Sequence, residues 1–248
     1  MDNLEIQKKT WDALAQIDPM WAILTDAQKQ GGKWDSGDFF QQGRTEIQGL
    51  LSELKDLGIP AAEGDVLDFG CGIGRLSQAF CEHFRSCTGV DISPHMIARA
   101  AEHNRFPDRC RYVVNDAPYL HQFPDGSFDL VYSNIVLQHI HPDVAAGYIR
   151  EFARLVRSGG LVVFQIPYWI HWTRRVQWRR RLFEFFVRLG FKGHFLITKL
   201  KMNPMRMSSL RRESVEEILK ESGCSLRNVK SWGDGQIGSC RYIAVKQR

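Results

Sequence analysis

The sequence has the size and composition of one self-sufficient globular domain. It contains 248 residues, 44% hydrophobic and 25% charged, which excludes fibrous, collagen-like and disordered classes. A chain of this length buries roughly 70–75% of its extended surface on folding, and its six cysteines form no Cys-x-x-Cys pair. We therefore expect a reducing, cytoplasmic setting. No apolar run approaches the roughly 20 residues of a spanning helix, and the polar start does not resemble a signal peptide.

The net charge of +5 is unevenly distributed along the chain. Residues 168–201 contain nine basic residues against the single acidic residue Glu184, so this segment carries +8 and the rest of the chain −3. One basic, aromatic segment on a slightly acidic body predicts a local contact with an anionic partner or surface. The distribution argues against a protein that binds nucleic acid.

The predicted elements change character near Asp65. Residues 3–58 predict helices, because apolar residues recur at helical spacing on both sides of Asp18-Pro19. From Asp65 onward, short apolar runs alternate with helical patterns. Parallel strands need long crossovers, which are usually helices, so this alternation predicts a parallel sheet covered on both faces. After the basic segment, the sequence predicts one further helix and a closing strand.

The strongest local motif is a glycine-rich turn between a predicted strand and a predicted helix. Its glycines are Gly70, Gly72 and Gly74. Such glycines let the backbone approach a bound molecule, and the following helix presents unpaired N–H groups. The dinucleotide fingerprint requires a small residue where this chain has Arg75, and the preceding Asp68 would repel a diphosphate. A nucleoside that carries an amino acid therefore fits this turn better than a dinucleotide.

A second carboxylate, Asp91, ends the next predicted strand. It is expected beside the glycine turn at the carboxyl edge of the sheet, where a carboxylate can accept hydrogen bonds from both hydroxyls of a ribose. The alternative interpretation is that Asp91 caps the helix starting near Ser93. For Asp68, the alternative interpretation is that it is an ordinary acidic residue in a surface turn, with no ligand to bind.

In order, these motifs resemble those of the class I S-adenosylmethionine-dependent methyltransferases. The matching stretches lie within residues 60–167 and read VLDFGCGIGRLS, GVDIS, VVNDAPYL, FDLVYSNIVLQHI and RSGGLVVFQIP. The resemblance implies a doubly wound, mostly parallel, seven-stranded α/β sheet with an antiparallel last strand, and S-adenosyl-L-methionine as the cofactor. One departure is Ser158, where the family often has proline.

The resemblance also implies a set of cofactor-binding residues, which are Asp68, Gly70, Cys71, Gly72, Gly74, Asp91, Ile92, Asp116, Ala117, Ser133 and Asn134. Within this set, Asp91 would hold the ribose hydroxyls and Ile92 would pack on adenine. Asp116 would accept the adenine amine, and Ser133 or Asn134 would lie near the methionine end.

Methyl transfer from a sulfonium is an in-line displacement, so holding the acceptor close and aligned supplies much of the catalysis, roughly 7–11 kcal/mol. An oxygen acceptor must also lose a proton. The candidate bases are His139, His141 and His171, which follow predicted strands; His139 is the first choice. Helix capping near Pro142 is the alternative role, more so for His141. No clustered ligand spacing predicts a metal site.

The function that the resemblance implies is methyl transfer to an oxygen or nitrogen of a small-molecule or glycan-like acceptor, such as a sugar, a glycolipid or a quinone. SNIV at 133–136 stands where DNA amino-methyltransferases carry an Asn-Pro-Pro-Tyr or Asp-Pro-Pro-Tyr tetrad. One alternative is a noncatalytic cofactor-binding or scaffold protein that recruits a partner or membrane through the basic helix. A nicotinamide oxidoreductase is disfavoured by Arg75.

The basic segment predicts an amphipathic helix within residues 172–192. Such a helix can lie on an anionic membrane surface, cover an active site as a lid, or dock against a second subunit of a homodimer. These three roles, and that of an ordinary solvated helix, stay open from the sequence. Within a single domain, we expect a helical lead-in at 1–60, a cofactor-binding core at 61–167, a basic aromatic insertion at 168–204, and a C-terminal helix with strands at 205–248.

Overall fold

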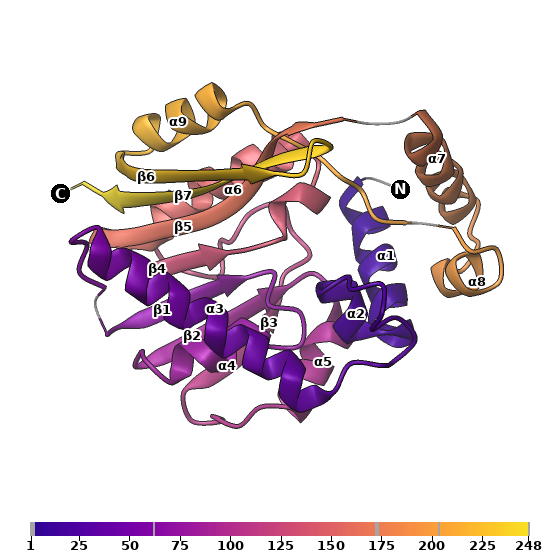
Figure 1. The fold of residues 1–248 in the computed structure, drawn as a ribbon, viewed down its shortest axis with the longest axis horizontal. Coiled ribbons are helices and arrows are strands. Elements are labelled where there is room, and N and C mark those ends of the chain that lie inside the picture. Colours follow the sequence, from indigo (N-terminus) through magenta and orange to yellow (C-terminus); the bar gives the residue numbers. More distant parts are fainter. Residues whose placement is uncertain (1–2, 62, 172–173, 203, 248) are drawn as a thin grey trace.

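The computed structural model describes residues 3–61, 63–171, 174–202 and 204–247, without the side chains of 174–177. A seven-stranded sheet in the order β3-β2-β1-β4-β5-β7-β6 forms its centre (Figure 1). The strands are β1 Asp65–Phe69, β2 Ser86–Asp91, β3 Cys110–Val114, β4 Phe128–Ser133, β5 Val156–Ile170, β6 Cys224–Gly233 and β7 Ile237–Lys246. Strand β7 runs antiparallel to the other six strands of the described sheet, which confirms the predicted doubly wound fold.

Helices cover both faces of the sheet. They are α1 Asn3–Ile17, α2 Pro19–Ile23, α3 Ser36–Asp56, α4 Arg75–Cys81, α5 Pro94–Glu102, α6 Pro142–Leu155, α7 Arg174–Arg188, α8 Gly193–Thr198 and α9 Arg212–Glu221, with a short 3₁₀ turn η1 Leu137–His139. Apolar residues of α3 and α4 pack on one face of the sheet, and those of α6 and α9 pack on the other. No helix in the described ranges is long and apolar enough to cross a bilayer.

The topology places a ligand site at one end of the sheet. Strand β1 is hydrogen-bonded in parallel to both β2 and β4, so the strand order reverses at β1. In open α/β sheets, ligands bind outside the carboxyl ends of the strands at such a reversal. Figure 1 shows α1 and α2 across this end, with α7 and α8 farther out beyond α1.

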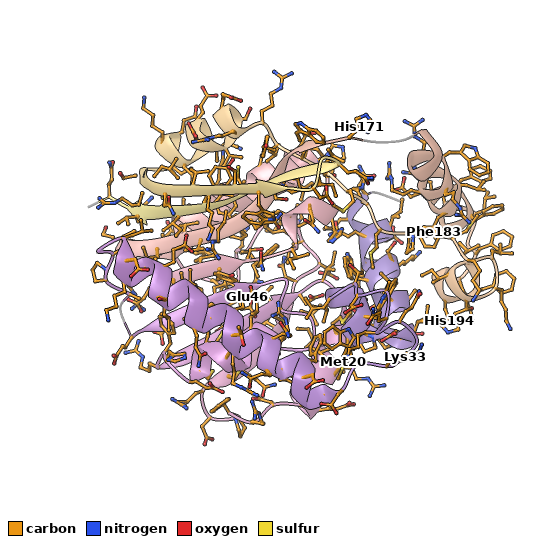
Figure 2. All side chains as sticks on the ribbon, viewed as in Figure 1. Met20, Lys33, Glu46, His171, Phe183 and His194 are labelled. Carbon is orange, nitrogen blue, oxygen red and sulfur yellow. The ribbon has the colours of Figure 1, made fainter. Side chains whose placement is uncertain are left out.

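The close approach of α3 to α4 depends on Gly43. A Cβ atom there would lie 2.4 Å from the carbonyl oxygen of Arg75, so any side chain at this position would push the two helices apart. With glycine, α3 passes directly over the start of α4. One turn farther along α3, Glu46 therefore reaches the floor of the site described below (Figure 2).

Candidate cofactor-binding and active site

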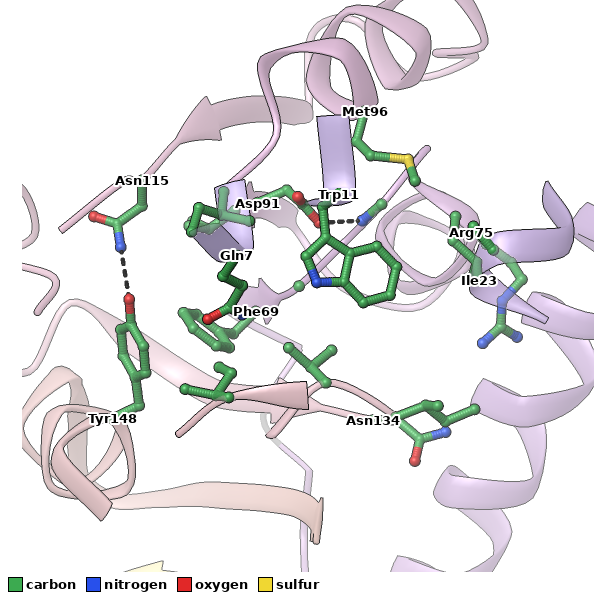
Figure 3. Close-up of a pocket in the computed structure, with 18 of the residues that line it drawn as sticks. Gln7, Trp11, Ile23, Phe69, Arg75, Asp91, Met96, Asn115, Asn134 and Tyr148 are labelled. Carbon is green, nitrogen blue, oxygen red and sulfur yellow. Dashed lines mark hydrogen bonds between the residues drawn. The ribbon is translucent and has the colours of Figure 1, made fainter. Parts of the chain in front are cut away.

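A pocket of about 760 Å³, counting its part open to solvent, lies at the carboxyl ends of β1, β2 and β4. Figure 3 shows Asn115 and Tyr148 at one end of the pocket and Asn134 and Arg75 at the other. Asp91 lies along one side, where Gly70 and Gly72 of the glycine turn also line the pocket. Gln7 and Trp11 of α1 lie across it. Gly70, Gly72, Asp91, Ile92 and Asn134 of the predicted set line this pocket. The first helix, which no motif singled out, closes one side.

Asp91 is held in place by two backbone N–H groups. Gly72 donates to its Oδ2 at 3.0 Å and Ser93 donates to its Oδ1 at 2.9 Å. The cap of α5 is Ser93, whose hydroxyl accepts from Met96 at 3.2 Å, so the helix-capping alternative for Asp91 does not hold. Burial raises the pKa of Asp91 to about 6, against the effect of these N–H groups.

Asp68 lies behind the glycine turn rather than in the pocket. Successive side chains of a strand point to opposite faces, so Phe69 faces the pocket while Asp68 faces α4. Asp68 is 1% exposed and accepts a hydrogen bond from the Ser77 hydroxyl at 2.6 Å. Burial raises its pKa to about 7. Asp68 therefore connects β1 to α4 and is not an acid of a surface turn.

The three glycines of the turn serve different neighbours. All have positive φ angles, of 78°, 54° and 83° in chain order. A Cβ at Gly70 would collide with Val136, and one at Gly72 with Ile23, both of which line the pocket. Gly74 instead packs against the partly buried Tyr112 ring away from the pocket. Cys71 is also buried outside the pocket, with its Sγ 3.6 Å from the Gly72 carbonyl oxygen.

At the end of the pocket where the resemblance places adenine, the structure brings Asn115 into the lining instead of its neighbour Asp116. The Asn115 amide donates to the Ala117 carbonyl oxygen at 2.9 Å and to the Tyr148 hydroxyl at 3.2 Å. The Asp116 carboxylate turns outward and binds Lys8 of α1 at 2.7 Å. The side chain of Asp116 thus lies outside the pocket lining, and Ala117 contributes its carbonyl oxygen to the hydrogen-bond network of Asn115 and Tyr148.

At the other end of the pocket, the lining side chains of Arg75 and Asn134 are held from behind by Glu46, and we call these three residues the floor of the site. The Glu46 carboxylate accepts hydrogen bonds from Asn134 at 2.7 Å, from Tyr132 at 2.9 Å and from Arg75 at 2.9 Å. Arg75 is only 4% exposed, so this carboxylate compensates a buried cation. Ser133 lies outside the pocket, where its hydroxyl donates to the Phe69 carbonyl oxygen at 3.1 Å.

Ile135 has a strained backbone beside this floor. Its φ of 61° lies in the left-handed region, which a β-branched residue rarely adopts. The Ile135 N–H donates to the side-chain oxygen of Gln165 at 3.1 Å, and the Gln165 amide donates to Ser239 at 3.0 Å. Such strain persists where surrounding groups hold it and is concentrated at functional sites. Gln165 is the polar side chain that holds this turn.

We expect Gln165→Leu to lower the rate of methyl transfer more than it weakens the cofactor complex. The substitution keeps the volume but leaves the Ile135 N–H without its acceptor, so the strained turn can relax toward an ordinary conformation. We expect a decrease of about tenfold in kcat, or about 1.4 kcal/mol. Single-turnover rates and S-adenosylhomocysteine affinity measure the two effects separately. An unchanged kcat contradicts the role of Gln165.

The three candidate histidines do not line the pocket. His139 is buried, with Nδ1 2.7 Å from the Arg206 carbonyl oxygen and Nε2 3.2 Å from the Gln138 amide. Because a carbonyl oxygen only accepts, Nδ1 carries the proton and Nε2 accepts from the amide. Burial also lowers the pKa of His139 to about 4. With both nitrogens engaged and a ring edge against Trp11, His139 serves to position α1.

The other two histidines have local roles. His141 is the N-cap of α6, where its Nδ1 accepts from the Asp143 N–H at 3.4 Å. His171 lies at the end of β5, and its backbone N–H donates to the Gln236 carbonyl oxygen at 2.7 Å. Its side chain borders a separate groove described below. Within the described ranges, no three His, Cys, Asp or Glu side chains converge as a metal site would require.

Cofactor affinity should depend on pH through Asp91. Ribose hydroxyls donate best to an ionised carboxylate, and the pKa of Asp91 is raised to about 6. The ionised form is therefore lost as the pH falls through 6. We expect S-adenosylhomocysteine affinity to be constant above pH 7 and to fall by up to about tenfold per unit below pH 6. Titration calorimetry checks this, and Asp91→Asn should flatten the profile. A flat profile for the unsubstituted protein contradicts the assignment.

Comparisons with known proteins agree with this geometry. Residues 67–164 match the family model described as a methyltransferase domain. A stretch of 125 residues is 40% identical to 2-methyl-6-phytyl-1,4-hydroquinone methyltransferase of Synechocystis sp., covering 50% of this chain and 38% of that protein. A stretch of 164 residues is 29% identical to a probable chloroplastic tocopherol O-methyltransferase of Oryza sativa subsp. japonica, covering 61% of this chain and 44% of that protein.

The fold comparison covers nearly the whole chain. The structure of magnesium protoporphyrin IX methyltransferase from Synechocystis with bound SAH superimposes with a TM-score of 0.64 and 17% identity, over 99% of this chain and all of that one. This likeness concerns the fold alone. The curated relatives are matched over less than half of their own length.

Residues 67–164 therefore match a methyltransferase domain, and the glycine turn with Asp91 and the reversed strand order lie within the matched region. This match agrees with the resemblance of the ordered motifs to the class I S-adenosylmethionine-dependent methyltransferases.

Proposed function

We propose that this protein binds S-adenosyl-L-methionine in the pocket beside Asp91 and transfers its methyl group to a hydroxyl oxygen of a small apolar acceptor of the lipid-linked hydroquinone class. The relatives described above are named for a phytyl hydroquinone and for tocopherol, and both of these acceptors carry a ring hydroxyl and a hydrocarbon tail. The single observation that carries the proposal is the Asp91 carboxylate, held by the Gly72 and Ser93 N–H groups at the edge of the pocket.

The described residues fit this cofactor. Asp91 offers a fixed acceptor for ribose hydroxyls, Ile92 and Met96 offer apolar surface for adenine, and the Asn115 amide lies at the same end. When bound, the cofactor supplies an electrophilic sulfonium methyl. The protein's own part is to hold the acceptor oxygen in line with that methyl, because such a displacement needs alignment above all. Methyl transfer leaves S-adenosylhomocysteine, and the hydroxyl proton of the acceptor is released to water at the open side of the pocket, since none of the three candidate histidines lines it. Trp11 and Gln7 cover the pocket on the α1 side.

Two further hollows border the pocket in sequence. A shallow hollow beside Trp34 shares Ile23 and Ile135 with the pocket. Through Thr25, this hollow adjoins a longer groove between α2, the end of β5 and residues 197–207. The side chains of this groove are mainly apolar and include Leu14, Ile170, Ile197, Met202, Met205 and Met207. Flexible methionine side chains suit an acceptor with an aliphatic tail.

The experiment that tests the proposal is an acceptor screen with methyl-labelled S-adenosylmethionine. Prenylated hydroquinones, sugar nucleotides and glycolipids are compared at equal concentration, each with and without the protein. We expect label in the hydroquinone, and a lower KM for the prenylated compound than for the same ring without its tail. Label in a sugar nucleotide alone would contradict the proposed acceptor class, and cofactor binding without transfer to any compound would contradict methyl transfer.

A further inference from the structure

The segment formed by α7 and α8 has two apolar faces, of which one is exposed. Phe183 and Val187 of α7 are buried and pack against α8, and Figure 2 shows Phe183 on the side facing α1. Trp178, Phe185 and Leu189 are 63%, 54% and 60% exposed. At roughly 100° per residue along a helix, these three fall on one stripe, nearly opposite the buried pair. A soluble helix ordinarily has one apolar stripe, and that stripe faces the core.

Large exposed apolar side chains also lie on α8 and its flanking residues. We define the α7–α8 patch by its six large apolar side chains, which are Trp178, Phe185, Leu189, Phe191, Phe195 and Leu200. These are half of the twelve large hydrophobic side chains that are exposed in the described part of the chain, and they fall within residues 178–200. Such concentration marks an interaction surface, because single exposed apolar residues are normal but clusters are not.

The charge around the α7–α8 patch is positive and uncompensated. The exposed basic residues of this segment are Arg179, Arg181, Arg188, Lys192, Lys199 and Lys201. In the ranges that the structure describes, none of these six forms a salt bridge. The one acidic residue within 178–201, Glu184, is occupied by Arg180 and by Arg206 at 3.1 Å. An anionic surface would therefore complement this segment, whereas a second copy of the patch would meet like charge.

We propose that the α7–α8 patch docks on a bilayer surface with anionic headgroups. Aromatic and leucine side chains on one side of a helix, bordered by arginine and lysine, bind at the headgroup boundary through apolar burial and attraction to anionic lipids. The patch adjoins the methionine-lined groove, since Ile197 and Lys201 line that groove while Phe195 and Leu200 belong to the patch. The docked protein thus presents the groove to the lipid phase.

This inference extends the sequence-based expectation for residues 172–192, of which 172 and 173 and the side chains of 174–177 lie outside the described residues. It goes beyond the proposed methyl transfer. Docking is measured without cofactor or acceptor, so a failure of one proposal leaves the other standing.

The test is co-sedimentation of the full chain with phosphatidylcholine vesicles, with and without phosphatidylglycerol. We expect binding to the anionic vesicles, weakened by added salt, and little binding to the neutral ones. Phe185→Ser/Leu189→Ser should reduce the vesicle partition coefficient at least tenfold, about the effect of removing two interfacial apolar side chains. Arg181→Gln/Arg188→Gln should weaken binding and reduce its salt dependence.

A matched control is Leu57→Ser/Trp232→Ser, which removes two side chains of similar exposure outside the patch and should leave vesicle binding unchanged. The patch variants should keep the melting temperature and S-adenosylhomocysteine affinity of the unsubstituted protein. The proposal is overturned if that protein does not bind anionic vesicles, if Phe185→Ser/Leu189→Ser binds them equally well, or if the substitutions change the oligomeric state instead.

Discussion

Replacing Asp91 by alanine should weaken S-adenosylhomocysteine binding by at least about 100-fold, or nearly 3 kcal/mol. The carboxylate is fixed by two backbone N–H groups and faces the pocket, so its free oxygen lone pairs are pre-positioned for ribose hydroxyls. Hydrogen bonds to a charged group contribute about 1.5–3 kcal/mol each when the alternative is an unpaired partner. Titration calorimetry at pH 7.5, where Asp91 is ionised, measures the effect directly.

The matched control is Asp116→Ala. Asp116 was also expected to bind the cofactor, but its carboxylate turns outward to Lys8. We expect the affinity of this variant to change by less than about threefold, as exposed ion pairs contribute little. Equal losses for the two variants, or none for Asp91→Ala in a folded protein, would mean that the ribose contact is misplaced.

The largest stability effect should come from Glu46→Gln. The amide keeps an oxygen for Asn134 and Tyr132 but removes the charge opposite Arg75, which is 4% exposed. An uncompensated buried cation costs about 3–5 kcal/mol. Because the Glu46 side chain is 21% exposed, we expect about 2–4 kcal/mol. At this chain length, such a loss lowers the melting temperature by about 4–16 °C.

Two further variants test whether the loss of stability in Glu46→Gln comes from the unpaired charge of Arg75 or from the substitution of a glutamate as such. Glu102→Gln breaks the exposed pair with Arg99 and should change the melting temperature by less than about 2 °C. Glu46→Gln/Arg75→Met removes both charges and should recover much of the lost stability, because a pair replaced by neutral groups is often tolerated. If the Glu46→Gln variant is as stable as the unsubstituted protein, the role of Glu46 is contradicted.

The fold and the glycine turn were predictable because their signals are local. Alternating strand and helix patterns from Asp65 onward determine a parallel sheet, and Gly70 and Gly72 mark the turn where it meets a ligand. Asp91 was placed correctly beside that turn because parallel strands bring their carboxyl ends to one edge. The structure adds the N–H groups that orient it.

Other parts of the site depend on contacts that sequence patterns do not encode. Glu46 is far along the chain from Asn134, and nothing near it indicates a buried partner. Tyr148 joins Asn115 only through packing of α6 on the sheet. The histidine predictions placed His139 at the correct edge, but a position after a strand does not fix side-chain direction, and its ring turned toward Arg206. The outward direction of the Asp116 side chain, toward Lys8, has the same origin.

The central claim is that the pocket beside Asp91 holds an amino-acid nucleoside rather than a dinucleotide. Titration calorimetry of the unsubstituted protein with S-adenosylhomocysteine, and separately with NAD, tests it most directly. The account predicts one saturable site for S-adenosylhomocysteine, competed by S-adenosylmethionine, and no comparable heat with NAD. Tighter binding of NAD, or no binding of S-adenosylhomocysteine by the folded protein, would contradict it.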